Sequence, residues 1–213
     1  MLTVFFVQRG DLSLRNRSAN PAMLSGKPLI VGGNIEMLKR SLVQLATMSN
    51  NMPVIRINQR MRMEASQLES VQSKMTDEQS YIALICLSCG FNKDDIRNQS
   101  EMLKERFVDY LESKQAAGIC NVGNEQHPSP NSIVHVFPPC EFATTFLQRN
   151  SPDLFETIRQ QRANYLFVVI TSASSFLVSI VLPAFLLAPV PLALFHESLK
   201  YSFAAHQHLC DDC

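Results

Sequence analysis

The stretch "VIRINQRMRM", residues 54 to 63, alternates apolar and polar residues over most of its length. Successive side chains of a β-strand point to opposite faces, so the pattern predicts a strand with one apolar and one polar face. The polar face carries Arg56, Asn58, Arg60 and Arg62. Like charges this close repel one another unless water or an anion screens them. The pattern favours either an anionic partner or local carboxylates that pair with the arginines and keep an edge strand soluble.

The remaining sequence indicates a domain that mixes strands with helices. Further strand-like runs are rich in β-branched and aromatic residues and cover 2–7, 28–31, 81–87, 132–137 and 165–170. Apolar residues at three- and four-residue spacing predict helices over 65–75 and 101–117, and a third helix should begin at Ser151-Pro152. The regular strand-helix alternation of a doubly wound sheet is missing. The sequence therefore predicts an α+β domain with a mainly antiparallel, curved or barrel-like sheet.

Charge and cysteine usage limit the class of protein. The 213 residues include 19 Lys plus Arg and 19 Asp plus Glu, so no global field favours nucleic acid or an anionic membrane. Any electrostatic function must come from local clusters of charge. The first residues lack the pattern of a secretory signal, so the six cysteines are expected to be reduced thiols in an intracellular compartment.

The predicted helix over 101–117 has a polar stripe of its own. Arg106, Tyr110 and Lys114 are spaced four residues apart, which places a cation, a phenol and a second cation on one helix face. A solvated surface is the ordinary explanation of such a stripe. Its function depends on what lies beside it in the fold.

Several stretches of the chain resemble the Spen paralogue and orthologue C-terminal (SPOC) domain, a family found at the end of split-ends type transcriptional regulators. The matching blocks are "INQRMRMEASQLESV" (57–71), "YIALICLSCG" (81–90), "LKERFVDYLESKQAAGICNV" (103–122), "VHVFPPCEF" (134–142) and "YLFVVI" (165–170). The resemblance covers 1–171 and implies one α+β domain, a distorted seven-stranded, mainly antiparallel β-barrel decorated with helices. Residues 172–213 form an apolar tail outside the family pattern.

The resemblance also implies a function without catalysis. Members of this family are adaptor modules in the nucleus that bind phosphoserine-containing peptides, such as acidic tails of transcriptional corepressors and phosphorylated C-terminal repeats of RNA polymerase II. The chain is therefore expected to be part of a larger transcription regulator, without a cofactor. No RNA-recognition motif is visible, so specific binding to nucleic acid is not expected from this chain.

Carried over position by position, the resemblance predicts a phosphopeptide-binding site. The phosphate-gripping pair falls on Arg60 and Arg62, a third basic contact on Arg56, the flanking groove residues on Tyr110 and Lys114, and an early-strand cation on Arg15. On one strand face, arginines two residues apart stand roughly 6.5 to 7 Å apart, so their planar donors can converge on one phosphate. Arg56 would stand about 13 Å from Arg60 and is assigned to a second acidic group.

Other clusters of reactive residues are better explained as packing or chance. Cys86 and Cys89 have the spacing of half a zinc site, but on a regular strand their side chains point to opposite faces. The terminal "HQHLCDDC" (206–213) packs four possible zinc ligands without the usual loop between ligand pairs. His127 and His135 have no catalytic partner at recognisable spacing. No metal site and no catalytic residue are predicted.

The tail carries an alternative function. Residues 165–195 contain no charged side chain, and the segment 176–195 has about the length that crosses a bilayer. Three prolines interrupt that segment, at 183, 189 and 191. It is interpreted as a membrane anchor, as an apolar hairpin packed on the domain, or as residues read past a splice site or stop. The first interpretation would make the chain a membrane-tethered interaction protein.

Overall fold

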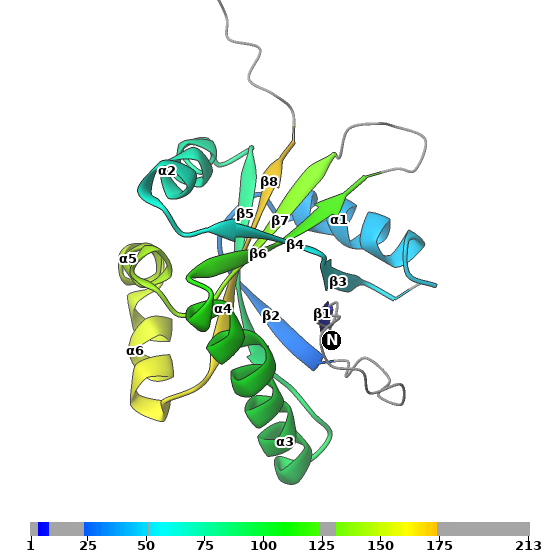
Figure 1. Cartoon of the computed structure of the whole chain (residues 1–213), viewed down its shortest axis with the longest axis vertical. Helices are drawn as coiled ribbons and strands as arrows, with labels where there is room; N and C mark the ends of the chain where they lie inside the picture. The colour runs from blue at the N-terminus through cyan, green and yellow to red at the C-terminus, as the bar shows by residue number, and fades with distance from the viewer. Residues whose placement is uncertain (1–3, 9–23, 51, 124–130, 174–213) are drawn as a thin grey trace, which may run out of the picture. The chain divides into compact units, whose positions relative to one another are not determined.

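The structure is a computed structural model that describes residues 4–8, 24–50, 52–123 and 131–173 (Figure 1). These residues form a curved sheet with helices on both of its faces. The strands are β1 Val4–Gln8, β2 Leu24–Gly33, β3 Val54–Ile57, β4 Gln59–Arg62, β5 Tyr81–Ser88, β6 Ala116–Val122, β7 Ser132–Phe137 and β8 Tyr165–Ser172. The helices are α1 Ile35–Thr47, α2 Ala65–Lys74, α3 Lys93–Leu103, α4 Asp109–Ser113, α5 Glu141–Asn150 and α6 Pro152–Gln161, with a π-helical segment, η1 Lys104–Val108, between α3 and α4.

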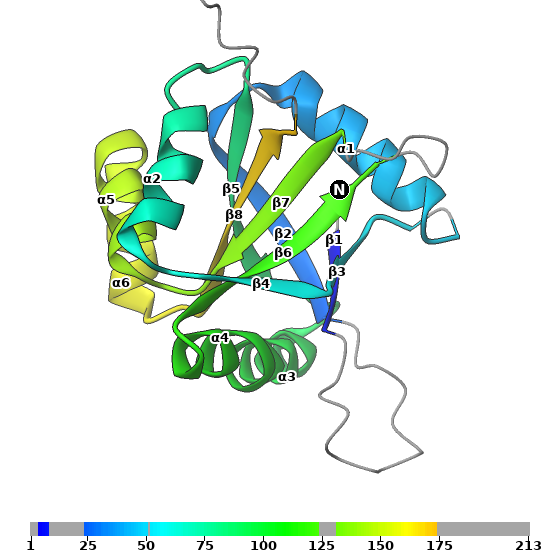
Figure 2. The same cartoon turned by 45° about the horizontal axis from the view of Figure 1, so that its top comes forward.

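The strands form one sheet in the order β3-β1-β2-β5-β8-β7-β6-β4. All neighbours are antiparallel except β1 and β3, which run parallel. The two end strands, β3 and β4, follow each other in the chain and are separated only by Asn58, so the sheet must curve to bring its ends together (Figure 2). β3 and β4 do not pair with each other, so the described sheet is not closed into a barrel.

The predicted fold class is confirmed, with two differences in detail. The chain is α+β, and its curved, mainly antiparallel sheet carries helices, as expected. The described residues contain eight strands rather than seven, and the sheet remains open. The predicted strand over 54–63 is two strands, because the chain breaks at Asn58 where it passes from one end of the sheet to the other.

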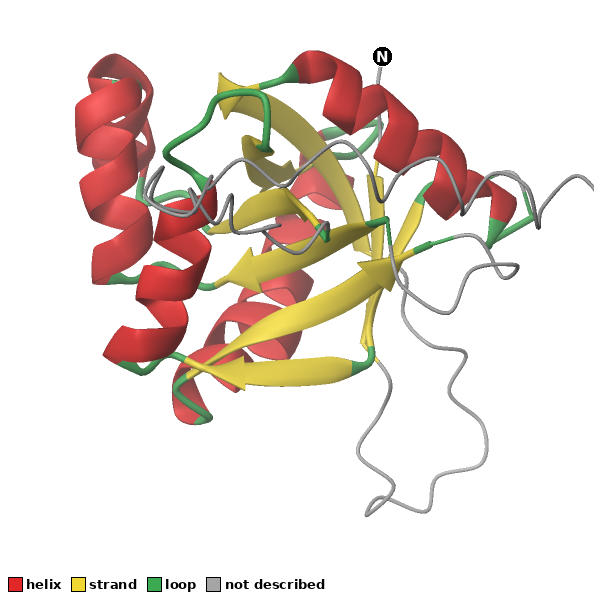
Figure 3. Ribbon diagram, turned by 90° about the horizontal axis from the view of Figure 1, so that it is seen from above, coloured by secondary structure: helices red, strands yellow, loops and turns green. Residues whose placement is uncertain are grey.

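Two hydrophobic clusters lie on the two faces of the sheet. The first joins α1, α3, η1 and α4 to one face and contains Leu38, Phe107 and Leu111. The second joins α2, α5 and α6 to the other face and contains Val71 and Leu147 (Figure 3). Because both faces of the central strands are covered, β5 and β8 are nearly continuous apolar runs rather than alternating ones.

The segment between β5 and β6 differs most from the predicted helix over 101–117. The helix begins earlier, at Lys93, where the Asn92 side chain accepts a hydrogen bond from the Asp95 N–H at 2.8 Å. It ends at Ser113, and Gln115 adopts a left-handed conformation with φ 45°. The chain then enters β6, whose residues are almost all buried between β4 and β7. Pairing with β4 and β7 and burial in the sheet stabilise the strand conformation here, and they outweigh the helical propensity of its two alanines.

Candidate functional site

Arg60 and Arg62 project from β4 on its exposed side. Both are exposed, and the Arg62 side chain keeps 84 % of its accessible surface. Met61 and Met63 point the other way and pack partly buried against the second hydrophobic cluster. The alternation predicted from the sequence therefore holds along β4, and it places two guanidinium groups on one face.

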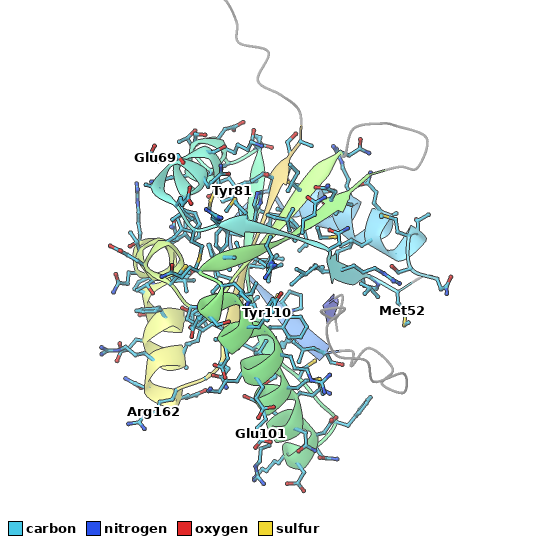
Figure 4. The ribbon with its side chains drawn as sticks, viewed as in Figure 1. Met52, Glu69, Tyr81, Glu101, Tyr110 and Arg162 are labelled. Atoms are coloured by element: carbon cyan, nitrogen blue, oxygen red, sulfur yellow. The ribbon has the colours of Figure 1, made fainter. Side chains whose placement is uncertain are left out.

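The first turn of α4 brings Tyr110 to this face. The Nη1 of Arg60 donates a hydrogen bond to the Tyr110 hydroxyl at 2.9 Å, and its guanidinium carbon lies 5.6 Å from the ring centroid. Figure 4 labels Tyr110 on α4, next to β6 and β4. The hydroxyl and the ring together hold the Arg60 side chain in place without a carboxylate.

Lys114 is the C-cap residue of α4, directly after Ser113, and it is exposed. The next residue, Gln115, accepts a hydrogen bond from the Met63 N–H at 2.9 Å through its carbonyl oxygen. This bond fixes the turn between α4 and β6 against β4, so the backbone of Lys114 lies beside the strand that carries the arginines. The structure thus brings Arg60 into contact with Tyr110, and it places the backbone of Lys114 beside the strand that carries Arg60 and Arg62.

Arg106 precedes Tyr110 by four residues and is exposed. It lies in η1, where π-helical bonding replaces the regular α-helical repeat and turns Phe107 and Val108 into the core. Among the described residues, no hydrogen bond or ion pair connects Arg106 to Arg60, Arg62 or Tyr110. The stripe of Arg106, Tyr110 and Lys114 assumed an unbroken α-helix, and η1 interrupts that helix at Arg106, so the four-residue spacing alone does not place Arg106 beside Tyr110.

Arg56 lies on the far side of the Asn58 break. It is exposed on β3, and its backbone approaches the Cys120 thiol of β6. Burial raises the pKa of that thiol, while a hydrogen bond to the Arg56 backbone and the arginine's charge oppose the rise. The 13 Å estimate assumed a straight strand, so it does not apply. Arg56 and Arg60 instead lie along β6, beside Cys120 and opposite Gly118 respectively.

Gly118 is a residue of this site that the sequence interpretation missed, because it directly follows the helix predicted over 101–117. It pairs with Arg60 across the β4–β6 ladder. A Cβ added there would lie 2.8 Å from Cγ2 of Ile57. Because Gly118 has no side chain, Ile57 at the end of β3 can pack closely against β6. The break at Asn58 follows Ile57 directly and therefore lies close to Arg60. The feature of the sequence that could have identified Gly118 as a residue of the site is its position inside the block "KQAAGI".

Few carboxylates compete for these cations. Arg62 lies 3.4 Å from Glu64, but both side chains are well exposed, so the pair is weak. Asp109, next to Tyr110, is occupied by Lys104 at 2.8 Å, and this pairing raises the pKa of the lysine. In the described part of the chain, Arg56, Arg60 and Lys114 have no carboxylate within ion-pair distance.

Several sequence predictions fall outside the described residues: Arg15, His127, the terminal "HQHLCDDC" and the segment 176–195. Within the described ranges, no group of three His, Cys, Asp or Glu residues could hold a metal ion. The helices of these ranges are too short or too polar to cross a membrane.

The described cysteines are free and belong to the packing of the domain. Cys86 is buried in β5, and burial raises the pKa of its thiol to about 12. Cys89 is half-buried just beyond the end of β5. Cys120 lies in the first hydrophobic cluster, and Cys140 packs partly buried against the second at the start of α5.

Comparison with known proteins identifies the family. A sequence profile described as "SPOC domain" matches residues 12–173. The chain is 42 % identical over 166 residues to mouse Msx2-interacting protein, a match that covers 78 % of this chain and 4 % of that protein. It is 38 % identical over 141 residues to Protein split ends of Drosophila melanogaster, covering 66 % of this chain and 2 % of that protein. The chain therefore spans a few per cent of the length of these relatives.

A solved structure is similar as well. The SPOC domain of human PHD-finger protein 3 aligns with a TM-score of 0.46 and 14 % identity, over 81 % of this chain and 96 % of that one. Because the family profile covers most of the sequence, from residue 12 to residue 173, the chain belongs to the SPOC domain family.

Proposed function

We propose that this domain is a non-enzymatic adaptor that binds phosphoserine peptides in the regulation of transcription in the nucleus. Membership in the SPOC family supports the general role of a protein-interaction module. The partners would be acidic phosphorylated segments, such as those of transcriptional corepressors or the C-terminal repeats of RNA polymerase II. The finer part of this proposal rests on the surface around β4.

The observation that carries the proposal is the exposed pair Arg60 and Arg62 beside Tyr110. A phosphoserine carries nearly two negative charges and three strong acceptor oxygens, so it can accept bonds from two guanidinium groups at once. Arginine suits this task because its planar donors are rigidly arranged and less strongly hydrated than an ammonium group. Two arginines on one strand face offer that arrangement.

The Arg60–Tyr110 contact favours phosphate binding over a purely solvated surface. Arg60 is ordered by a neutral hydroxyl and an aromatic ring, so its full charge remains available. Among the described residues, Arg60 has no ion pair that a bound phosphate would have to break. Ordering the side chain in advance also lowers the entropy that is lost when the peptide binds.

Lys114 and Arg56 extend the basic surface on two sides of the pair. Lys114 follows α4 next to β4, and Arg56 lies beyond the Asn58 break along β6. Neither pairs with a carboxylate in the described residues. We assign Lys114 to the phosphate region and Arg56 to a second acidic group of the peptide. Arg15 is retained as a further candidate contact.

The test is a titration of the full chain with matched phosphoserine and serine peptides at two salt concentrations. Hydrogen bonds to charged groups contribute about 1.5–3 kcal/mol each, so the phosphorylated peptide should bind at least about tenfold more tightly. The advantage should shrink at higher salt, because ions screen exposed charges. Equal affinity for the two peptides would show that the site does not recognise phosphate.

A further inference from the structure

β4 has an open backbone edge. It is the last strand of the sheet, and β6 is its one pairing partner among the described residues. Figure 2 shows β4 at the border of the strands, beyond β6. A strand edge presents N–H and C=O groups that can pair with another extended chain.

The alternation of hydrogen-bonded and non-hydrogen-bonded pairs between β4 and β6 determines which backbone groups of β4 face outward. The Met63 N–H donates to the carbonyl of Gln115, its direct opposite, at 2.9 Å. In an antiparallel ladder, hydrogen-bonded and non-hydrogen-bonded pairs alternate along the strand. The backbone groups of Met61 therefore face β6, while those of Arg60 and Arg62 face away from it.

The break at Asn58 limits this open edge at its beginning. The Asn58 N–H donates to the Ile119 carbonyl at 3.3 Å, although Ile119 is already the partner of Gln59. Two residues opposite one are the mark of a β-bulge, which ends regular pairing. At the other end α2 begins at Ala65. The regular edge is therefore only about four residues long.

We propose that an acidic phosphopeptide binds as an additional antiparallel strand on β4, with its backbone paired to Arg60 and Arg62. This inference rests on the proposed function and adds its binding mode. The same two residues would supply backbone hydrogen bonds at the edge and guanidinium groups on the face. The positive charge of this face selects an acidic peptide over a neutral one or a second copy of β4, whose own arginines would repel. Among the described residues Arg60 has no carboxylate partner, and Arg62 has only its exposed pair with Glu64.

Strand alternation then determines the sequence pattern of the peptide. A phosphoserine opposite Arg60 directs its side chain to the face of Arg60, Arg62 and Tyr110. Because the peptide would run antiparallel to β4, the acidic residue that falls opposite Arg62 is the one two positions before the phosphoserine, and it shares the same face. The residue between them points to the other face, where Met61 and Met63 are partly exposed. An apolar side chain fits that position.

Amide hydrogen exchange of the full chain, followed by NMR, tests this pairing. The probe is a short synthetic peptide with glutamate, valine and phosphoserine in sequence, the order that antiparallel pairing requires. At saturation, exchange of the Arg60 and Arg62 amides should slow at least tenfold. The Met61 amide faces β6 already and should change little. Unchanged exchange at both arginines in a saturated complex would overturn the proposal.

Backbone methylation of the same peptide gives a second, independent measurement. N-methylation of the phosphoserine or glutamate amide removes a donor to β4 and should weaken binding at least tenfold. Methylation of the valine amide is the matched control and should have little effect. Losses that do not alternate, or that fall only on the valine amide, would contradict antiparallel pairing on β4.

The two proposals fail in different ways. Phosphate-dependent binding without protection of Arg60 and Arg62 would leave the proposed function intact and remove the added strand. Equal binding of phosphorylated and unphosphorylated peptide with alternating methylation effects would keep the added strand and remove phosphate recognition. An absence of binding by either peptide would count against both.

Discussion

Arg60 and Tyr110 are fifty residues apart in the sequence, yet the arginine donates a hydrogen bond to the tyrosine hydroxyl at 2.9 Å. The guanidinium carbon also lies 5.6 Å from the ring centroid. This contact joins the edge strand β4 to the start of α4 and orders a cation that has no carboxylate partner among the described residues. It connects the two sequence patterns that predicted the site.

Replacing Arg60 and Arg62 together by alanine should abolish phosphopeptide binding with little change in stability. Loss of two charge-assisted contacts predicts an affinity at least about 100-fold lower by titration. The free energy of unfolding should change by less than about 1 kcal/mol, because both side chains are exposed. Arg97→Ala with Arg149→Ala is the matched control, since it removes the same charge from exposed positions on α3 and α5. Equal losses in both double variants would indicate only a general charge effect.

Tyr110→Phe should weaken phosphopeptide binding without removing it. The substitution deletes the hydroxyl that accepts the hydrogen bond from Arg60 but keeps the ring beneath the guanidinium group. A net hydrogen bond contributes roughly 0.5–1.5 kcal/mol, which corresponds to about a two- to tenfold change in the dissociation constant. Calorimetry with the phosphoserine peptide measures this change. Affinity equal to that of the wild type would show that the hydroxyl does not order Arg60 for binding.

Gly118→Ala should destabilise the domain, because the new Cβ would lie 2.8 Å from Cγ2 of Ile57. Forcing an extra methyl group into a packed region costs typically 1–3 kcal/mol, measured by chemical denaturation. The cost should fall sharply when Ile57 is also replaced by alanine, since the clashing atoms are then gone. Additive effects of Gly118→Ala and Ile57→Ala would rule out the close approach of these two residues.

His135 should make the domain less stable in acid. Burial lowers its pKa from 6.5 to about 4, and its Nδ1 has no hydrogen-bond partner within the described part of the chain. In the unfolded chain the imidazole of His135 binds a proton below pH 6.5, whereas in the folded domain it binds one only near pH 4. The free energy of unfolding therefore falls as the pH drops from 6.5 through about 4. The full loss is on the order of 3 kcal/mol.

Denaturant unfolding at several pH values checks this expectation. His135→Leu removes the titrating group and should flatten the loss of stability across that window. An unchanged pH profile in the leucine variant would show that other groups cause the acid sensitivity.

The strand pattern was largely readable from the sequence. The predicted strands over 81–87, 132–137 and 165–170 correspond to β5, β7 and β8, because buried strands consist of continuous β-branched and aromatic residues. The helix over 65–75 corresponds to α2, and proline at the first position correctly placed α6. Local composition is sufficient wherever burial and propensity agree.

Other elements were missed because their local signals were weak or misleading. α1 was not predicted, since Ser41 lies between Leu38 and Leu45 on its buried face. α5 was missed as well, and its first residue has no side-chain cap. β6 was read as the end of a helix because its alanines favour helix locally. The choice of a strand there depends on pairing with β4 and β7, which are distant in sequence.

The sequence by itself determined the α+β class, the family, and the alternation that places Arg60 and Arg62 on one face of a strand. The family follows from the resemblance of whole blocks of sequence. The class and the alternation follow from periodicity and composition, which act between near neighbours in the chain. Only the tertiary structure decided that the strand breaks at Asn58, that Tyr110 reaches Arg60, and that the free backbone groups of β4 belong to the two arginines. Those features depend on how β6 pairs and how the sheet curves, and both are set by contacts between residues far apart in the chain.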